Sequence, residues 1–330
     1  MRRKSLLQMY HELKESPSSS DFPNLLGNTM YKVLLKEFLG FPSPWRQYCQ
    51  VGNLADFKSH DRVILSGAPD LDRIAADGNY QDAKFSDAKY SILLETFGKT
   101  FKLDRRTIIN DDLNGLTRIP GAMGKASVRT MVKQILNMLK GGVNAYDGAT
   151  LFALRGGAAV NYNVNVALAN TAAGAAAVAA AMSKMRLGTD PVTGELLGVT
   201  PKFLLTGTTL APVARQLLGS ATLWPASANG GTPNNNVQML IPIEEPLIDS
   251  QISTTFWAVL ADPADCPVIE IGFLDGKENP DLLVEKPSMM NLAGGGDDPY
   301  GYEFDELRYK VRHDWGMQLA YYQGICRGNS

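Results

Sequence analysis

The sequence predicts an α+β fold, and three observations support this prediction. A long amphipathic helix is expected in the middle of the chain, over residues 113–140. Two strand patterns enclose a long charged stretch before that helix. After it, short strands bounded by proline, aspartate or glycine alternate with further helical patterns. Such a mixture of elements is typical of α+β domains and argues against an all-helical or an all-β protein.

The central helix follows a strand-like run at 101–103 and a group of charged residues. From Leu113 to Lys140 apolar residues recur at helical spacing, and Gly141 and Gly142 are expected to end the helix. Five basic residues fall within an arc of about 80° on a helical wheel; these residues are Arg118, Lys125, Arg129, Lys133 and Lys140. The helix therefore carries an apolar side and, apart from it, a basic stripe.

The composition bounds the class of protein. At 330 residues the chain is longer than one compact core normally supports, which favours two lobes. A net charge of −2 gives no global attraction to nucleic acid, so any such contact has to come from a local patch such as the basic stripe. The 3 cysteines lack close spacing, which argues against a disulfide framework, and no apolar run approaches membrane-spanning length. We expect a soluble protein made in the cytoplasm.

The first segment, residues 5–15, has the pattern of a short amphipathic helix. Its apolar side is formed by Leu6, Leu7, Met9, Tyr10 and Leu13. Isolated helices of this length are marginal in water, so the segment needs another surface, in its own chain or in another one. An ordinary N-terminal helix that packs on its own domain is the alternative. A second amphipathic helix is expected from Thr29 to Phe38.

Residues 56–98 have the pattern of a long projecting hairpin, with strands at 62–65 and 90–97. Charges of both signs lie along it, at Asp70, Asp72, Arg73, Asp77, Asp82, Lys84, Asp87 and Lys89. A loop of this length is unusual inside a compact domain, which favours an element that contacts a neighbouring subunit. A disordered surface loop is the alternative.

The remaining chain is expected to continue with strands and helices in alternation. The patterns predict a second hairpin over 150–166, an alanine-rich helix over 171–186, a strand at 203–206 and a helix that ends at Gly219. A mobile loop follows over 225–236. Strands are then predicted at 237–243, 256–261, 268–274, 306–311 and 318–322.

Motifs for catalysis are missing from the sequence. The three histidines are isolated, and there is no zinc pattern of cysteines, no H-E-x-x-H and no G-x-S-x-G. The run GAMGKAS at 121–127 lacks the first glycine and the preceding strand of a phosphate loop. Asp104, Asp111 and Asp112 could hold a divalent cation, but the adjacent Arg105 and Arg106 favour a structural ion-pair knot. We therefore predict no enzyme, no cofactor and no metal.

Six blocks of sequence, taken together with the order of the elements, carry a resemblance to a known family. The blocks are FKLDRRTIINDDL at 101–113, RIP at 118–120, DGATLF at 147–152, ADP at 261–263, IEIGFLDG at 269–276 and YKVRHDWG at 309–316. The chain resembles the Hong Kong 97-type major capsid proteins of tailed-phage heads. Within that fold it is most similar to the Mu-like phage major head subunit family.

The resemblance implies a major capsid protein that self-assembles into an icosahedral shell around double-stranded DNA. It implies an N-terminal arm at 1–55, an extended loop at 56–98, a peripheral domain at 99–166 and 299–330 with a spine helix, and an axial domain at 167–298. The arm would lace subunits together, the extended loop would lie on a neighbouring subunit, and the loop at 225–236 would point toward the capsomer axis. The basic stripe would face packaged DNA or dock on acidic residues of a neighbour.

The resemblance also implies partners and a location. The partners would be further copies in hexameric and pentameric capsomers, DNA bound without sequence preference, and separate scaffold, portal and decoration proteins, with no membrane. The protein would be assembled in the host cytoplasm and reside in the virion. Some family members join a loop lysine to an asparagine of a neighbour; Lys84 and Lys89 match by position only, and we expect no cross-link. The alternatives are an encapsulin-like nanocompartment shell and a metal-dependent enzyme that uses Asp104, Asp111 and Asp112.

Overall fold

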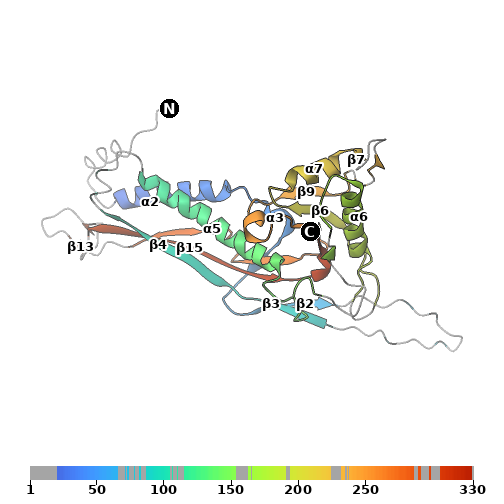
Figure 1. Cartoon of the computed structure of the whole chain (residues 1–330). Coiled ribbons are helices and arrows are strands. Elements are labelled where there is room, and N and C mark those ends of the chain that lie inside the picture. The colour runs from blue at the N-terminus through green and yellow to red at the C-terminus, as the bar shows by residue number, and fades with distance from the viewer. Residues whose placement is uncertain are drawn as a thin grey trace. The chain divides into compact units, whose positions relative to one another are not determined.

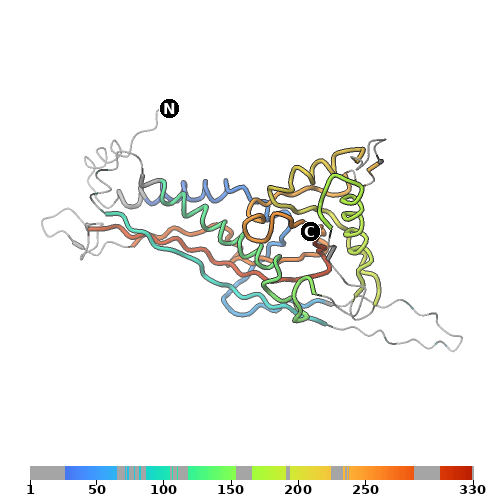
Figure 2. The backbone as a smooth tube through the Cα atoms, viewed as in Figure 1, coloured from blue at the N-terminus to red at the C-terminus, as the bar shows by residue number. Residues whose placement is uncertain are grey.

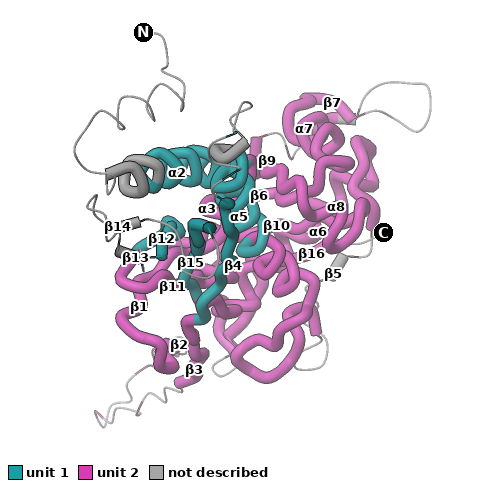
Figure 3. The backbone as a smooth tube through the Cα atoms, turned by 90° about the vertical axis from the view of Figure 1, so that its left-hand side faces the viewer, with its two compact units in different colours: residues 1–41, 95–131, 277–315 teal, residues 42–94, 132–276, 316–330 magenta. Residues whose placement is uncertain are grey.

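The computed structural model describes residues 21–65, 87–104, 115–153, 166–190, 194–223, 238–285 and 305–328, with stretches of one to three residues between these ranges. The chain divides into two compact units (Figure 3). The first unit comprises residues 1–41, 95–131 and 277–315, and the second comprises residues 42–94, 132–276 and 316–330. Each unit therefore combines segments that lie far apart in the sequence.

The first unit is an antiparallel sheet with helices packed on it. Its elements are α2 (Asp21–Leu39), β4 (Glu95–Asp104), the first part of α5 (Gly115–Lys140), β12 (Asp281–Val284), β15 (Glu306–Leu319) and the short pair β13 (Met289–Met290) and β14 (Asp297–Asp298). β15 pairs with β4 on one side and with β12 on the other, and β4 and β15 run side by side in Figures 1 and 2. Met30 and Leu34 of α2 pack on the sheet, where Phe101 and Tyr309 stack at 5.2 Å across the two long strands.

Helix α5 confirms the central prediction from the sequence. Its buried residues recur at helical spacing, including Val128, Met131 and Ile135. The helix ends where glycine was expected to end it, because Gly141 adopts a φ of 97°, a left-handed conformation that glycine reaches without strain.

The second unit contains a mixed sheet in the order β5-β16-β10-β6-β9. Its strands are β5 (Asn163–Val164), β6 (Pro201–Thr206), β9 (Ile241–Glu244), β10 (Trp257–Ala261) and β16 (Ile325–Gly328). Every residue of the central strand β10 is buried. Helices α6 (Ala172–Arg186) and α7 (Ala211–Gly219) contact this sheet, and Thr171 caps α6 by accepting a hydrogen bond from the Gly174 N–H at 3.3 Å.

The second unit also contains smaller elements. β1 (Gln50–Leu54) pairs in parallel with β11 (Ile269–Leu274), and β2 (His60–Leu65) pairs antiparallel with β3 (Asp87–Ile92). The others are α3 (Trp45–Tyr48), α8 (Ile248–Gln251), η1 (Tyr322–Gly324) and the strand pair β7 (Thr222–Leu223) and β8 (Thr232–Pro233). α3 lies beside a fully buried carboxyl group, Glu245, which accepts hydrogen bonds from Ser43 and Tyr48. Burial raises the pKa of Glu245.

Two element boundaries differ from the sequence predictions. α2 spans Asp21–Leu39 and therefore includes residues before the expected start at Thr29. β15 is one strand of 14 residues where two were expected. Gly316 allows the strand to continue, since a Cβ at this position would lie 2.2 Å from the Leu93 carbonyl oxygen.

One further prediction about a connection was wrong, and a second was wrong at the residues that the structure describes. The hairpin expected over 150–166 is not formed by its described residues: Leu151 and Phe152 lie in a turn, and β5 pairs in parallel with β16. The loop predicted at 225–236 ends in a fixed structure, because Asn234 and Asn236 are buried. The Asn234 side chain donates to the carbonyl oxygens of Leu217 and Ser220, and the Asn236 side chain donates to the Ala175 carbonyl at 2.7 Å.

Candidate assembly interface

The β2–β3 hairpin presents one buried face and one exposed face. Ile64, Tyr90 and Ile92 are buried, whereas the alternating residues Asp61, Val63, Lys89 and Ser91 are exposed. On the exposed face the Lys89 ammonium lies 2.8 Å from Asp61 Oδ2, and Ser91 donates to Asp61 Oδ1 at 2.6 Å. These contacts, with Lys89 first, hold the pKa of Asp61 below its usual value. Val63 is 63% exposed beside these charges, so the face is amphipathic.

The buried face of the hairpin is held by one carboxylate from β11. Glu270 is 5% exposed. It accepts a hydrogen bond from the Tyr90 hydroxyl at 2.6 Å, and Arg62 approaches it with Nε at 3.2 Å and Nη2 at 3.1 Å. Burial and the neighbouring Glu270 raise the pKa of Tyr90. One side chain thus binds both strands of the hairpin at its base.

The outer residues of the predicted extended loop are described only in part. Arg73, Asp82 and Asp87 are exposed, and Leu71 is 99% exposed. The positions of the other predicted loop charges, Asp70, Asp72, Asp77 and Lys84, lie outside the described residues. The predicted arm residues Leu6, Leu7, Met9, Tyr10 and Leu13 also lie outside them. Their roles at an interface stay predictions.

The basic stripe on α5 is exposed at all its positions, but its members differ. Lys125 Nζ lies 2.8 Å from Glu37 Oε2 of α2, and this bond holds the pKa of Glu37 below its usual range. Lys125 therefore has a partner within its own unit. Among the described residues, no ion pair is formed by the other members, Arg118, Arg129, Lys133 and Lys140.

The glycines near Lys125 explain why α2 and α5 approach each other closely. A Cβ on Gly124 would lie 2.4 Å from the Leu34 carbonyl oxygen, and one on Gly121 would lie 3.1 Å from Glu37 Cγ. The run GAMGKAS, which has some letters of a phosphate loop, is therefore a helix-packing sequence. Its lysine binds a carboxylate of the facing helix.

The structure describes two of the residues in and next to the predicted ion-pair knot. Asp104 and Arg106 are both exposed, and Asp104 ends β4 opposite Glu306 of β15. Glu306 itself binds Lys102 at 2.9 Å and Arg308 at 2.6 Å. Arg105, Asp111 and Asp112 lie outside the described residues, so the knot stays a prediction. No cluster of three or more metal-ligating side chains occurs in the described part of the chain.

His313 joins three elements of the first unit. It is 3% exposed, its Nδ1 lies 2.9 Å from Ser127 Oγ of α5, and its ring packs against Phe38 of α2 and Trp315 of β15. Burial lowers the pKa of His313 to about 4 although a backbone hydrogen bond and Asp314 act in the opposite direction. The histidine is therefore neutral at physiological pH and acts as a packed core residue.

Sequence reasoning missed Glu270, Glu37 and His313 as structural residues. Tyr90 and Glu270 are separated by 180 positions, and Ser127 and His313 by 186. No periodic pattern connects positions so far apart. A tyrosine or arginine on the buried face of a predicted strand is the single signal that points to a missing polar partner.

Solved structures with the same fold come from tailed phages. A chain of Mycobacterium phage Adephagia aligns with a TM-score of 0.53 and 14% identity over 85% of this chain and 87% of that chain. The capsid structure of cyanophage P-SCSP1u aligns with a TM-score of 0.55 and 9% identity over 87% of this chain and 89% of that chain. A chain of Microbacterium phage Oxtober96 aligns with a TM-score of 0.51 and 12% identity over 85% of this chain and 88% of that chain. The fold is therefore the Hong Kong 97-type capsid fold.

A family match identifies the chain itself. Residues 89–328 match the family described as phage capsid protein, and since this is well over half of the sequence, the chain belongs to that family. It is a major capsid protein, located in the virion capsid, whose copies assemble into a shell. The nanocompartment and enzyme alternatives are not favoured.

No curated protein matches the sequence. None of the helices in the described ranges has both the length and the apolar character needed to cross a membrane.

Proposed function

We propose that this capsid protein forms hexameric and pentameric capsomers of an icosahedral head that encloses double-stranded DNA. The observation that carries the proposal is the family match over residues 89–328. Weak contacts suffice for such a shell, because many repeated interfaces act together once it closes. Electron microscopy of the purified protein tests the proposal. Closed shells or capsomer rings are expected, and a protein that stays monomeric under all assembly conditions would refute it.

We also propose the domain roles that the resemblance to the capsid family implies. The arm at 1–55 laces subunits together, the extended loop at 56–98 lies on a neighbour, the peripheral domain comprises 99–166 and 299–330, and the axial domain comprises 167–298. The amphipathic exposed face of the β2–β3 hairpin supports the role of the extended loop, since Val63 can be buried by a neighbour while Asp61 and Lys89 select register. Exposed ion pairs contribute little energy, so register is their main effect.

Membership of the Mu-like subfamily is a finer proposal. The sequence blocks at 101–113, 269–276 and 309–316 support it. In the structure these blocks overlap strands β4, β11 and β15. β4 and most of β15 belong to the first unit, and β11 belongs to the second. Assembly in the host cytoplasm with separate scaffold, portal and decoration proteins belongs to the same proposal. Purifying the procapsid and identifying its proteins by mass spectrometry tests it; a procapsid that holds this chain alone would contradict the scaffold and portal.

The basic stripe is proposed to contact packaged DNA through its phosphates or to bind a neighbour. Arg129 and Lys133 are exposed and form no ion pair with another described residue, which leaves both available. Arg129→Glu together with Lys133→Glu distinguishes the two roles. Loss of DNA retention with normal shells indicates contact with DNA, and binding should then fall steeply with salt. Loss of capsomers indicates a neighbour. Lys99→Glu with Lys310→Glu, exposed residues of β4 and β15, is the matched charge control.

A further inference from the structure

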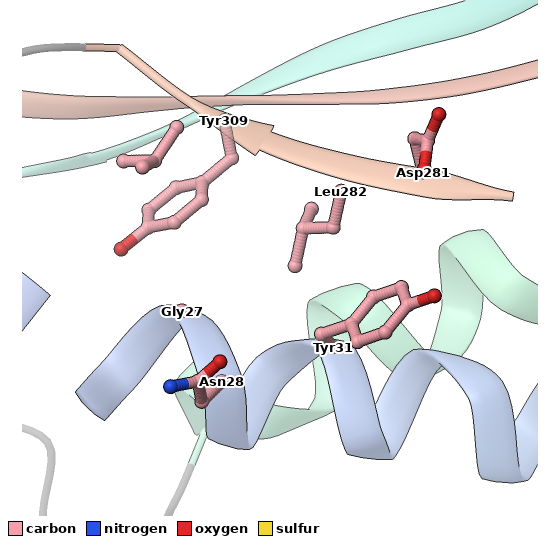
Figure 4. Close-up of a pocket in the computed structure, with 7 residues that line it drawn as sticks. Gly27, Asn28, Tyr31, Asp281, Leu282 and Tyr309 are labelled. Carbon is pink, nitrogen blue, oxygen red and sulfur yellow. The ribbon is translucent and has the colours of Figure 1, made fainter. Parts of the chain in front are cut away.

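In the described part of the first unit, β12 forms an edge of the sheet and lies beside a pocket. β12 pairs with β15 on one side, and among the described residues no strand pairs with its other side. A pocket of about 260 Å³ lies between β12 and α2. It is lined by Gly27, Asn28, Tyr31, Asp281, Leu282, Val284 and Tyr309 (Figure 4). Figure 4 shows α2 as one wall and β12 as the other, with Leu282 between the two tyrosine rings.

The hydrogen-bond register determines which main-chain groups of β12 face outward. The Glu285 N–H donates to the Arg308 carbonyl at 3.0 Å, and Leu283 lies opposite Lys310 in the same register. In an antiparallel pair, hydrogen-bonded and non-hydrogen-bonded residues alternate. The N–H and C=O groups of Leu282 and Val284 therefore point away from β15. The side chains of Leu283 and Val284 are 37% and 39% exposed, so this edge is apolar as well as unpaired.

An unpaired edge next to a pocket is the arrangement by which domains bind an extended peptide as an added strand. The main-chain groups of the edge supply the hydrogen bonds, and the pocket receives alternate side chains of the peptide. An exposed apolar edge is otherwise a liability that proteins cover. We propose that β12 and its pocket bind residues 5–13 of a second copy of this chain as an added strand. The proposal rests on the proposed assembly into a shell and names where the arm binds.

The length and sequence of the arm support this occupant. Twenty residues precede Asp21, where α2 begins, and an extended chain of that length spans at most about 70 Å. Within SLLQMYHEL at 5–13, Leu7 and Met9 project to the same side of a strand, as Leu282 and Val284 do. An isolated helix of this length is marginal in water, so binding as a strand forfeits little stability. If every copy both donates and accepts an arm, the contact is head-to-tail, which forms a ring where the rotation between successive subunits closes.

A photoreactive label at the pocket tests the proposal in the full-length chain. Val284→Cys accepts a benzophenone label selectively, because the native Cys49, Cys266 and Cys326 are buried. Particles are assembled from equal amounts of heavy-nitrogen and ordinary subunits, irradiated, and analysed by mass spectrometry. We expect cross-links to residues 5–13, with about half of the linked pairs mixed in isotope, because the donor is another copy drawn at random. Leu187→Cys carrying the same label, on an exposed site of the second unit away from the β2–β3 hairpin, is the matched control and should give few of these links.

The other outcomes overturn the proposal in distinguishable ways. If every cross-linked pair contained one isotope only, each arm would bind its own subunit. Links to another segment, or no links in particles that form normally, would remove the arm from this site while leaving the capsid function intact. If the unsubstituted protein forms neither shells nor capsomers, the proposed assembly itself fails.

Discussion

Alanine substitutions at Gly124 and Gly121 should have opposite effects on stability, although the two glycines are three residues apart in α5. Either substitution favours the helix by about 1 kcal/mol, because glycine has the greater conformational freedom in the unfolded chain. At Gly124 the new Cβ would lie 2.4 Å from the Leu34 carbonyl oxygen and 3.2 Å from the Phe38 nitrogen. Both contacts are to backbone atoms of α2, which cannot rotate away.

The expected magnitudes follow from these contacts. Overpacking of a core costs about 1–3 kcal/mol, and a backbone neighbour places Gly124→Ala at the upper end, so that the net loss is about 2 kcal/mol. At Gly121 the nearest atom is Glu37 Cγ at 3.1 Å, on a side chain that can move. Gly121→Ala should therefore be neutral or stabilising by up to about 1 kcal/mol.

Urea unfolding of unassembled subunits, followed by circular dichroism, measures both variants against the parent chain. Gly124→Ala should lower the unfolding midpoint and weaken assembly, whereas Gly121→Ala should do neither. A Gly124→Ala subunit as stable as the parent would refute the close packing of α2 on α5. Equal losses from both alanines would show that the contact partner, backbone or side chain, does not decide the outcome.

Three further predictions follow from the contacts described above. Glu270→Gln should destabilise the β2–β3 hairpin by about 2–3 kcal/mol, since charged hydrogen bonds to Tyr90 and to the partly exposed Arg62 are weakened; unchanged hydrogen exchange of the hairpin amides would contradict this. The pKa of His313 is about 4 in the folded protein against an ordinary 6.5, so the unfolded chain binds the proton first as the pH falls. About 3 kcal/mol of the free energy of unfolding should therefore be lost between pH 6.5 and pH 4. His313→Gln should reduce this dependence of the unfolding free energy on pH, measured by urea unfolding. Particles boiled in detergent should release one band near 35.9 kDa, and a ladder would reveal a cross-link.

The elements that the sequence predicted well are those set by local pattern. The periodicity over 113–140 predicts α5, found at Gly115–Lys140, because a long amphipathic repeat leaves few alternatives. The first strand of the hairpin and the buried strands β6, β10 and β11 were also predicted to within a few residues, whereas the single strand expected at 90–97 is divided between the end of β3 and the start of β4. The hairpin expected at 150–166 failed because its second strand pairs with β16 from the far end of the chain.

The candidate site could be predicted less completely than the fold. Alternation in β2 and β3 indicates an exposed face, but the partner of the buried Tyr90 is Glu270, and nothing local points to it. The basic stripe was read from spacing alone, and spacing cannot show that Lys125 lies opposite Glu37 of another helix. Tertiary contacts between distant segments decide these roles, and a single sequence does not record them.

The fixed ends of the predicted axial loop make it a point for engineering. Thr222 and Leu223 pair with Pro233 and Thr232, and the buried Asn234 holds the chain just beyond them. The two ends are thus joined whatever lies between 223 and 232, and doubling the length of a closed loop costs only about 0.6 kcal/mol. A foreign peptide inserted there would be repeated once per subunit. Because Asn234 anchors the chain beyond the insertion, each particle would carry as many copies of the peptide as it has subunits.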